Sequence, residues 1–280
     1  MTDWMKAGNT AVVTGAAGGI GLEAARRYAA GGMNVVIADV KDELGDVADE
    51  LAGIAGSPDK VLAKSCDVSK LEEVEALRDA AIAQFGKVHC LMNNAGIGRM
   101  GSLPWEDVEQ LHTILGINLM GVVHGCHAFI PSMIEHGEAG AVINTGSKQG
   151  ITRPPGNYAY NISKASVLAY TESIAHAFRG LENCSLKAHL LIPAFVYTPM
   201  VSAFIPQKPP FAATAEETVS FMLDALKKDD FYILCPDNET PRELDEKRMQ
   251  WTADDMIKNR PALSRWHPDF ADEFERFVKG

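Results

Sequence analysis

Two tyrosines and a lysine in the stretch NYAYNISKAS, residues 157–166, have the types and spacing needed for acid–base chemistry. If this stretch is helical, Tyr160 and Lys164 lie four residues apart and share one face, because each residue advances ~100°. Tyr158 is six residues from Lys164 and points elsewhere. A free tyrosine loses its proton near pH ~10, and a neighbouring ammonium can lower that pKa into a useful range. Geometry therefore selects Tyr160 as the reactive tyrosine.

Ser147 is the second candidate for chemistry. It lies upstream of Tyr160, at the carboxyl end of the expected strand AVINT, where open parallel sheets present their ligand crevice. Its hydroxyl can donate a hydrogen bond to a carbonyl oxygen. Taken singly, a tyrosine–lysine pair on a helix is more often a surface contact, and a serine here is often a helix cap. The rest of the chain must therefore support the chemical interpretation.

The elements that would position these residues alternate between short apolar strands and longer helical patterns. Strands are expected at 9–15, 33–40, 60–68, 88–96, 141–147, 185–194 and 231–235, and helices at 21–32, 42–54, 71–86, 108–134, 159–180 and 214–228. This alternation is typical of βαβ units with a parallel sheet covered on both faces. It predicts a three-layer α/β fold, a Rossmann-type doubly wound parallel sheet.

Domain boundaries follow from the same pattern. Residues 1–240 are expected to form a single dinucleotide-binding and catalytic domain. Residues 241–280 are expected to form a helical C-terminal extension, packed on that domain or on a neighbouring subunit. The Pro-rich, aromatic-rich segment 195–211 is too irregular for one regular element, and we interpret it as a lid.

The lid and the loops near it suggest the kind of substrate. The lid residues Phe195, Tyr197, Phe204 and Phe211 are bulky and apolar, which favours a hydrophobic or aromatic substrate, although ordinary loop packing explains them equally well. Three further residues are expected in loops near the mouth of the site: Gln149, Arg153 and Met100.

The glycine-rich segment TGAAGGIG, residues 14–21, follows a strand and opens a helix. Gly15, Gly19 and Gly21, with Ile20 between the last two, would let the backbone come close to a pyrophosphate, whose charge the helix N-terminus stabilises. The spacing differs from G-x-G-x-x-G by one residue, so a turn without ligand remains an alternative.

Asp39 ends the second expected strand, VVIAD. An acidic side chain there can accept hydrogen bonds from the adenosine ribose hydroxyls and would repel a 2′-phosphate, although a helix cap is the alternative interpretation. Lys41 is near, but no Lys or Arg stands within the glycine segment or directly after Asp39. The sequence therefore predicts NAD as the cofactor in preference to NADP.

Taken together, these motifs resemble the short-chain dehydrogenase/reductase family. The resemblance covers about residues 8–235 and rests on TGAAGGIG, Asp67-Val68, NNAG at 93–96, Asn118 in INLMG, Ser147 in NTGS and Y-x-x-x-K at 160–164. It implies a single Rossmann-type domain with a seven-stranded parallel sheet, assembled as a homodimer or homotetramer.

The resemblance also implies roles for individual residues. Tyr160 would be the general acid/base, Lys164 the tyrosine activator and ribose ligand, Ser147 the carbonyl orienter and Asn118 the holder of a proton-relay water. Asp67 and Val68 would flank the adenine, Asn94, Ala95 and Gly96 would line the adenosine side, and Thr198 would contact the nicotinamide amide. The family's usual Pro-Gly near the nicotinamide is replaced here by Pro193-Ala194.

The predicted function is that of an NAD-dependent oxidoreductase that interconverts a secondary alcohol and a ketone by hydride transfer. Two alternatives remain open: a non-catalytic NAD-binding sensor or scaffold protein, and an epimerase or dehydratase on the same scaffold. The intact set of Ser147, Tyr160, Lys164 and Asn118 speaks against the first. The short C-terminal extension speaks against the second, which usually needs a larger substrate domain.

Composition and charge narrow the partners. A net charge of -11 argues against a nucleic-acid surface. The five cysteines are widely spaced, so neither a disulfide framework nor a zinc site is expected. His124, His127 and His136 could share a helix face, but no further ligand follows them and we expect no metal. The N-terminus lacks an apolar export segment and no long apolar span occurs, so we expect a cytoplasmic protein without a membrane partner.

Overall fold

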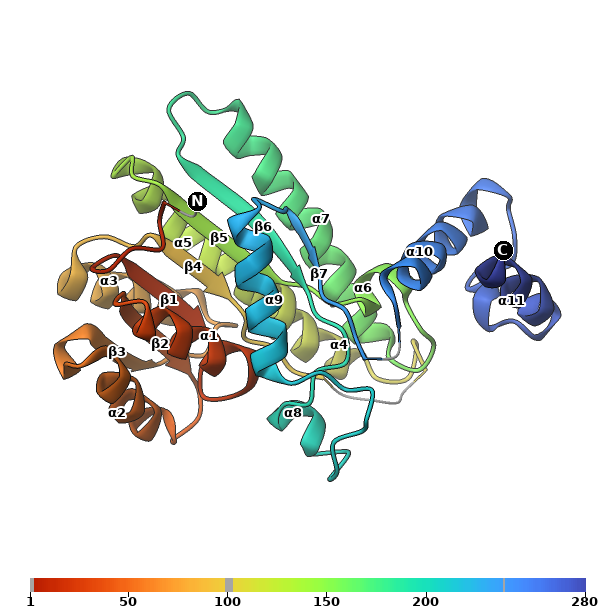
Figure 1. Cartoon of the computed structure of the whole chain (residues 1–280), viewed down its shortest axis with the longest axis horizontal. Coiled ribbons are helices and arrows are strands. Elements are labelled where there is room, and N and C mark those ends of the chain that lie inside the picture. Colours follow the sequence, from red (N-terminus) through yellow and green to blue (C-terminus); the bar gives the residue numbers. More distant parts are fainter. Residues whose placement is uncertain (1–2, 99–102, 239) are drawn as a thin grey trace.

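The computed structural model describes residues 3–98, 103–238 and 240–280, and its centre is a seven-stranded sheet (Figure 1). The strands are β1 Thr10–Thr14, β2 Asn34–Asp39, β3 Val61–Ser65, β4 Cys90–Asn93, β5 Gly140–Thr145, β6 Leu186–Ile192 and β7 Tyr232–Leu234. Their order is β3-β2-β1-β4-β5-β6-β7, and every pairing among these strands is parallel. The predicted doubly wound parallel sheet is confirmed.

Helices cover both faces of this sheet. The α-helices in the described part of the chain are α1 Gly19–Ala30, α2 Leu44–Ala55, α3 Leu71–Phe85, α4 Val108–Leu115, α5 Gly121–Glu135, α6 Gln149–Thr152, α7 Tyr158–Gly180, α8 Pro199–Ser202, α9 Ala215–Lys227, α10 Arg242–Ile257 and α11 Ala271–Lys279, and the last two do not cover the sheet. One core holds α1, α2 and α9, and the other holds α3, α5 and α7. Neighbouring strand residues such as Val12 and Val13 belong to opposite cores, because side chains alternate along a strand.

The long helix expected at 108–134 is interrupted. A π-helical segment, Gly116–Met120, separates α4 from α5 and buries Asn118 completely. Such wider turns insert an extra residue into a helix and often occur at functional sites. The whole run Val108–Glu135 is long and apolar enough to cross a membrane. In this fold its α5 part packs against the sheet, with Phe129 and Met133 fully buried in the second core.

A chain of buried polar side chains crosses the centre of the fold. Asn93 on β4 donates through Nδ2 to Asn144 Oδ1 on β5 at 2.9 Å, and Asn144 Nδ2 donates to Thr171 Oγ1 on α7 at 3.0 Å. Gly125 on α5 leaves room for Asn93, because a Cβ there would lie 2.0 Å from Asn93 Oδ1. These contacts fix the positions of β4, β5 and α7 relative to one another.

The C-terminal extension forms a small cluster of its own. Helices α10 and α11 project from the body beyond α6 (Figure 1). Trp251 is almost fully buried between Phe274 and Phe277, with ring centroids 5.2 and 5.3 Å away, and the Arg260 guanidinium lies 3.7 Å above its ring. The extension is therefore stabilised largely by its own aromatic contacts, and α10 joins it to the body.

Candidate functional site

A cavity of about 450 Å³ opens at the carboxyl ends of the strands. It lies where β1 and β4 are neighbours and the strand order reverses, which is where doubly wound sheets bind ligands. Most of the predicted site residues line it: Gly15, Gly19, Ile20, Asp39, Asp67, Val68, Asn94, Ala95, Gly96, Ser147, Tyr160, Lys164, Pro193 and Thr198. Two predicted site residues, Gly21 and Asn118, are not among the described residues that line the cavity and lie behind its wall.

The glycine loop shapes one end of the cavity. Gly15 has φ +66°, and a Cβ on it would lie 2.6 Å from Ala95 Cα. A Cβ on Gly21 would lie 2.3 Å from the Gly15 carbonyl oxygen, so this glycine serves close packing rather than contact with a ligand. Gly18 and Gly19 line the cavity at the start of α1, where free N–H groups favour an anion. This cradle fits a pyrophosphate.

Asp39 is held firmly beside that cradle. Its Oδ2 accepts the Ala17 N–H at 3.0 Å, and its Oδ1 accepts the N–H groups of Val40 at 2.8 Å and Lys41 at 3.3 Å. The carboxylate thereby joins the end of β2 to the glycine loop and lies in the cavity wall. Lys41 lines the same wall. A ribose hydroxyl could donate to Asp39, and Lys41 supplies the one cation beside it among the described lining residues.

The side of the cavity that was predicted to hold the adenine is formed after β3. Asp67 accepts hydrogen bonds from the Ser69 hydroxyl at 2.7 Å and the Ser69 N–H at 3.0 Å, and these bonds lower the pKa of Asp67. The Val68 side chain faces Gly121, where a Cβ would lie 2.6 Å from Val68 Cγ2. Asn94 braces the glycine loop, because its Nδ2 donates to the carbonyls of Thr14 at 3.1 Å and Gly15 at 3.2 Å.

Ser147, Tyr160 and Lys164 meet at the other end of the cavity. Ser147 Oγ accepts the Gln149 N–H at 3.1 Å, which leaves its own proton free to be donated elsewhere. Lys164 is 4% exposed, and its Nζ donates to the Thr145 carbonyl at 2.7 Å and lies 5.7 Å from the centroid of the Tyr160 ring. The helical-face argument placed the tyrosine and the lysine correctly on one side of α7.

The pKa shifts differ from the sequence-based expectation. Burial raises the pKa of Tyr160, and a hydrogen bond with Ser147 only partly opposes this rise. Burial also lowers the pKa of Lys164 to about 8. The expected lowering of the Tyr160 pKa by Lys164 is absent here, because desolvation dominates and the ammonium is engaged with the Thr145 carbonyl.

Asn118 is tied to the protein from both ends of its amide. Its Oδ1 accepts the Ile97 N–H at 2.8 Å, and its Nδ2 donates to the Ile97 carbonyl at 2.9 Å and to Ser163 Oγ at 3.2 Å. A Cβ on Gly96 would lie 3.2 Å from Asn118 Oδ1 and 3.7 Å from Lys164 Nζ, so the three residues meet. The role of Asn118 in holding a water stays a prediction.

Tyr158 and the histidines lie outside the site. The Tyr158 hydroxyl donates to the Asp107 carbonyl at 2.8 Å, away from the cavity. His124 Nδ1 lies 2.9 Å from the Val68 carbonyl oxygen, and His136 Nε2 lies 2.9 Å from that of Val88. Within the part of the chain that the structure describes, no group of three or more His, Cys, Asp or Glu side chains could hold a metal.

The end of the cavity beside the segment 195–211 is apolar. Of the expected lid aromatics, Phe195 and Phe204 line it, whereas Phe211 packs behind Phe195 with ring centroids 5.3 Å apart. The Tyr197 hydroxyl donates to the Pro206 carbonyl instead. Within this lid the chain forms the short helix α8, whose Met200 and Val201 also face the cavity.

Three residues from the neighbouring loops had been expected near the mouth. Gln149 lines the cavity, and Arg153 is not part of its wall. Met100 lies outside the described residues. Ala194, which replaces the family's glycine, also lines the cavity, and its φ is not positive, so its methyl group adds no left-handed strain.

Several lining residues were missed by sequence reasoning. Each lies within three positions of a predicted residue in the sequence: Gly18, Val40, Lys41, Cys66, Ile97, Gly98, Ile117, Gly146 and Asn157. Including every residue after a parallel strand would have found most of them, because those turns face the same crevice.

Comparisons with known proteins agree with this geometry. A family model described as short chain dehydrogenase matches residues 9–209. The 1-deoxy-11-beta-hydroxypentalenate dehydrogenase of Streptomyces exfoliatus is 32% identical over 91% of this chain and 93% of its own length.

Two solved structures are also similar. A short-chain dehydrogenase/reductase from Burkholderia phymatum in complex with NAD is 31% identical, with TM-score 0.83, over 93% of this chain and 97% of its own. An alcohol dehydrogenase from Thermococcus sibiricus complexed with 5-hydroxy-NADP is 28% identical, with TM-score 0.70, over 78% and 90%. These two relatives thus carry different cofactors, and they leave the choice between NAD and NADP to the residues of this chain.

Proposed function

Because this chain belongs to the short-chain dehydrogenase/reductase family, we propose that it is an NAD-dependent dehydrogenase that interconverts a secondary alcohol and a ketone by hydride transfer. The observation that carries this proposal is one continuous cavity, which has the glycine cradle and Asp39 at one end and Ser147, Tyr160 and Lys164 at the other. A dinucleotide held along that wall would reach from the cradle to the tyrosine.

The residues present fit such a cofactor. Gly18 and Gly19 would hold the pyrophosphate, Asp39 the adenosine ribose, and Lys164 the second ribose. When bound, NAD supplies a nicotinamide ring that accepts or donates a hydride at C4. The carboxylate of Asp39 is the basis for proposing NAD over NADP, because it would repel a 2′-phosphate.

The protein's own part in the reaction is to bind the alcohol and move its proton. In the oxidation direction, deprotonated Tyr160 removes the hydroxyl proton from the substrate. Ser147 donates a hydrogen bond to the same oxygen and stabilises the developing carbonyl. The Gln149 N–H occupies one acceptor position of Ser147 Oγ, and the hydroxyl proton of Ser147 stays available for donation. The hydrogen bond from Ser147 is the contact that favours the phenolate, while Lys164 lies 5.7 Å from the centroid of the tyrosine ring and is held by the Thr145 carbonyl.

The lid supports a hydrophobic or aromatic substrate. Phe195, Met200, Val201, Phe204 and Ile205 present apolar side chains to the cavity, and Phe204 is 59% exposed there. Such a wall gains free energy by covering apolar surface of a substrate. The relative from Streptomyces exfoliatus is a dehydrogenase of a hydroxylated compound, 1-deoxy-11-beta-hydroxypentalenate.

We also propose that the protein works in the cytoplasm as a homodimer or homotetramer, with a small-molecule substrate and with neither nucleic-acid nor membrane partners. The support for this proposal is the family's usual assembly, the acidic net charge, and five cysteines that are all free. Mass measurement in solution tests the assembly.

A spectrophotometric screen tests the catalytic proposal. Purified protein is mixed with secondary alcohols of graded apolar size and with NAD or NADP, and NADH or NADPH absorbance is followed. We expect turnover that improves with apolar substrates and a higher kcat/KM with NAD. A clear preference for NADP would refute the cofactor assignment. NAD binding without turnover of any alcohol or ketone would favour a sensor.

A further inference from the structure

A cluster of buried charges lies directly behind the catalytic serine. The Lys148 ammonium lies 2.5 Å from Asp245 Oδ2 and 3.2 Å from Asp237 Oδ2. The side chains of Lys148, Asp237 and Asp245 are only 17%, 14% and 8% exposed. Because Lys148 follows Ser147 in the sequence and Asp245 belongs to α10, this cluster connects the C-terminal extension with the active site.

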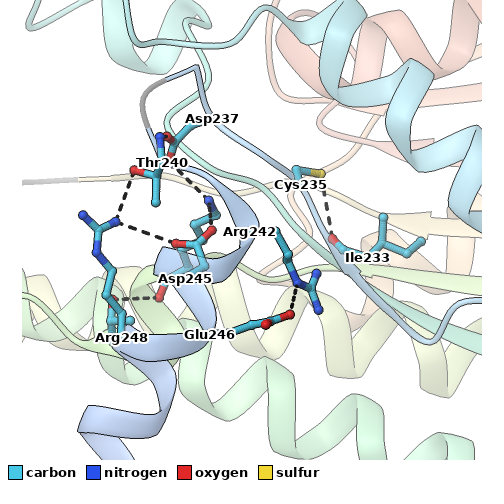
Figure 2. Close-up of polar contacts among 10 residues, drawn as sticks. Ile233, Cys235, Asp237, Thr240, Arg242, Asp245, Glu246 and Arg248 are labelled. Atoms are coloured by element: carbon cyan, nitrogen blue, oxygen red, sulfur yellow. Dashed lines mark hydrogen bonds and ion pairs between the residues drawn. The ribbon is translucent and has the colours of Figure 1, made fainter. Parts of the chain in front are cut away.

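The cluster is completed by Thr240 and Arg248 (Figure 2). Asp237 Oδ1 accepts the Thr240 N–H at 2.6 Å, and Arg248 Nη1 donates to Thr240 Oγ1 at 3.2 Å and lies 3.7 Å from Asp245 Oδ1. Burial raises the pKa of Asp237, but the Thr240 hydrogen bonds and the Lys148 charge outweigh it, so this pKa lies below its usual range. Two cations thus face two carboxylates.

The backbone of Lys148 holds the turn that presents Ser147. The Lys148 N–H donates to the Pro193 carbonyl at 3.2 Å, on the wall where the nicotinamide would lie. Its carbonyl accepts the Thr152 N–H at 3.0 Å and begins α6. The next residue, Gln149, donates its N–H to Ser147 Oγ. Any movement of Lys148 would therefore move both the serine hydroxyl and the hydrogen bond that orients it.

We propose that Lys148, held by its ion pairs with Asp237 and Asp245, is a positioning residue for hydride transfer, and that the pair with Asp245 makes the C-terminal extension part of the catalytic apparatus. This inference rests on the proposed dehydrogenase function. Removing one partner of a buried ion pair leaves the other charge uncompensated, so the turn must shift or admit water. A shift of ~1 Å at a reacting group can cost ~100-fold in rate.

The closing experiment measures kcat, the KM for the alcohol and the Kd for NAD of Lys148→Met and Asp245→Asn. We expect kcat of Lys148→Met to fall at least tenfold, with KM and Kd within about threefold of wild type. The kcat of Asp245→Asn should fall less, because Lys148 retains its ion pair with Asp237. Lys148→Arg should recover most of kcat, since it restores the charge. A purely structural anchor would reduce thermal stability without changing kcat of the folded enzyme.

A matched control lies on the same helix. Arg242 and Glu246 form an exposed ion pair at 2.8 Å, with both side chains 55% exposed, and Figure 2 shows it apart from the buried cluster. Glu246→Gln removes a charge from α10 just as Asp245→Asn does, but it touches neither Lys148 nor the turn. We expect wild-type kcat, KM and thermal stability from this variant.

The outcomes separate the two proposals. Folded Lys148→Met and Asp245→Asn with unchanged kcat, or with equal losses in kcat and NAD affinity, would overturn the positioning role alone. Failure of Lys148→Arg to recover kcat would also overturn it. If Lys148→Met does not fold, Asp245→Asn decides the question. An absence of turnover in the wild-type protein would overturn both the dehydrogenase function and this inference.

Discussion

The two ends of the cavity are constructed in different ways. The cofactor end is formed by short consecutive motifs at the ends of β1, β2 and β4, whose backbone geometry is fixed by Gly15, Asp39 and Asn94. The substrate end is lined by residues of α6, α7 and the lid, and the ion pair of Lys148 with Asp245 joins the turn behind it to the C-terminal extension. The first end depends on close approach of the backbone, braced by Asp39 and Asn94, and the second on buried charged side chains.

This difference determines what each end tolerates. At the cofactor end, an added methyl group meets backbone atoms that cannot move aside, such as Ala95 Cα next to Gly15. At the substrate end, functional groups such as Lys164 are buried, and burial itself moves their pKa values. Substitutions should therefore affect binding and stability at the first end, and catalytic rate and pH dependence at the second.

The largest effect is expected from Tyr160→Phe at the substrate end. Loss of the general acid/base should reduce kcat by ~10³-fold, within the usual range for such groups. NAD affinity, measured by calorimetry, should stay within about twofold. Tyr158→Phe is the matched control, because its hydroxyl only donates to the Asp107 carbonyl, and it should retain substantial activity. Equal losses in both variants would contradict the assignment of Tyr160.

Gly15→Ala tests the backbone-built end. Gly15 has φ +66°, so an alanine there would strain the backbone, and its Cβ would clash with Ala95 Cα at 2.6 Å. Gly137 has a similar φ of +68°, but a Cβ there would have nothing within 4 Å. Gly137→Ala should cost ~1–2 kcal/mol from the backbone alone. Gly15→Ala should cost a further ~1–3 kcal/mol from overpacking and also weaken NAD binding. Urea unfolding of the two variants measures the difference, and equal losses would show that close packing does not matter here.

A pH titration of stability tests the buried lysine. The Lys164 pKa is about 8 in the folded protein, against 10.5 in an unfolded chain. Between these values the unfolded chain binds more protons, so the contribution of this group to stability rises with pH. The cost of burying the charged Lys164 ammonium lowers the free energy of unfolding by ~3 kcal/mol, and this cost is fully present below pH ~8.

Lys164→Met removes that penalty, so its stability relative to wild type should be highest below pH ~8 and decline towards pH ~10.5. The free energies of unfolding of both proteins, compared across this range, give the trend. Comparing the two proteins cancels the other titrating groups, such as Tyr28, whose pKa burial raises. A difference that does not change with pH would contradict the depressed pKa.

The smallest effect concerns cofactor choice at the first end. Asp39→Asn removes a charged acceptor, and hydrogen bonds to charged groups contribute ~1.5–3 kcal/mol, so the kcat/KM ratio of NAD to NADP should fall by at least ~10-fold. Lys41→Met should act in the opposite direction by reducing NADP use. An unchanged ratio in Asp39→Asn would mean that another residue selects the cofactor.

Sequence reasoning worked best where local geometry determines the answer. Helical spacing was sufficient to predict that Tyr160, and not Tyr158, lies on the same side of α7 as Lys164, and the alternation of strands and helices predicted the sheet. It was less successful where packing decides: a glycine motif does not show that Gly21 packs behind the wall while Gly18 faces the cavity. The Tyr160 pKa depends on burial, which no spacing reveals.

The pairing of the active site with the extension could not be predicted for another reason. Lys148 lies just before α6 and Asp245 lies on α10, far along the sequence, and neither belongs to a motif. Charged residues are mostly exposed, so nothing in the sequence indicates which of them are buried together. Contacts of this kind follow from the fold, and only the structure brings them together.

The buried chain from Asn93 through Asn144 to Thr171 has a consequence for recombination between relatives. A chimaera whose crossover falls between β4 and α7 would take the partners of this chain from two parents. Unless both parents carry compatible side chains, it would leave an amide buried without a partner, at a cost of ~1–3 kcal/mol per group. Crossovers before β4 or after Thr171 keep the chain intact, so functional hybrids of this enzyme should accumulate there.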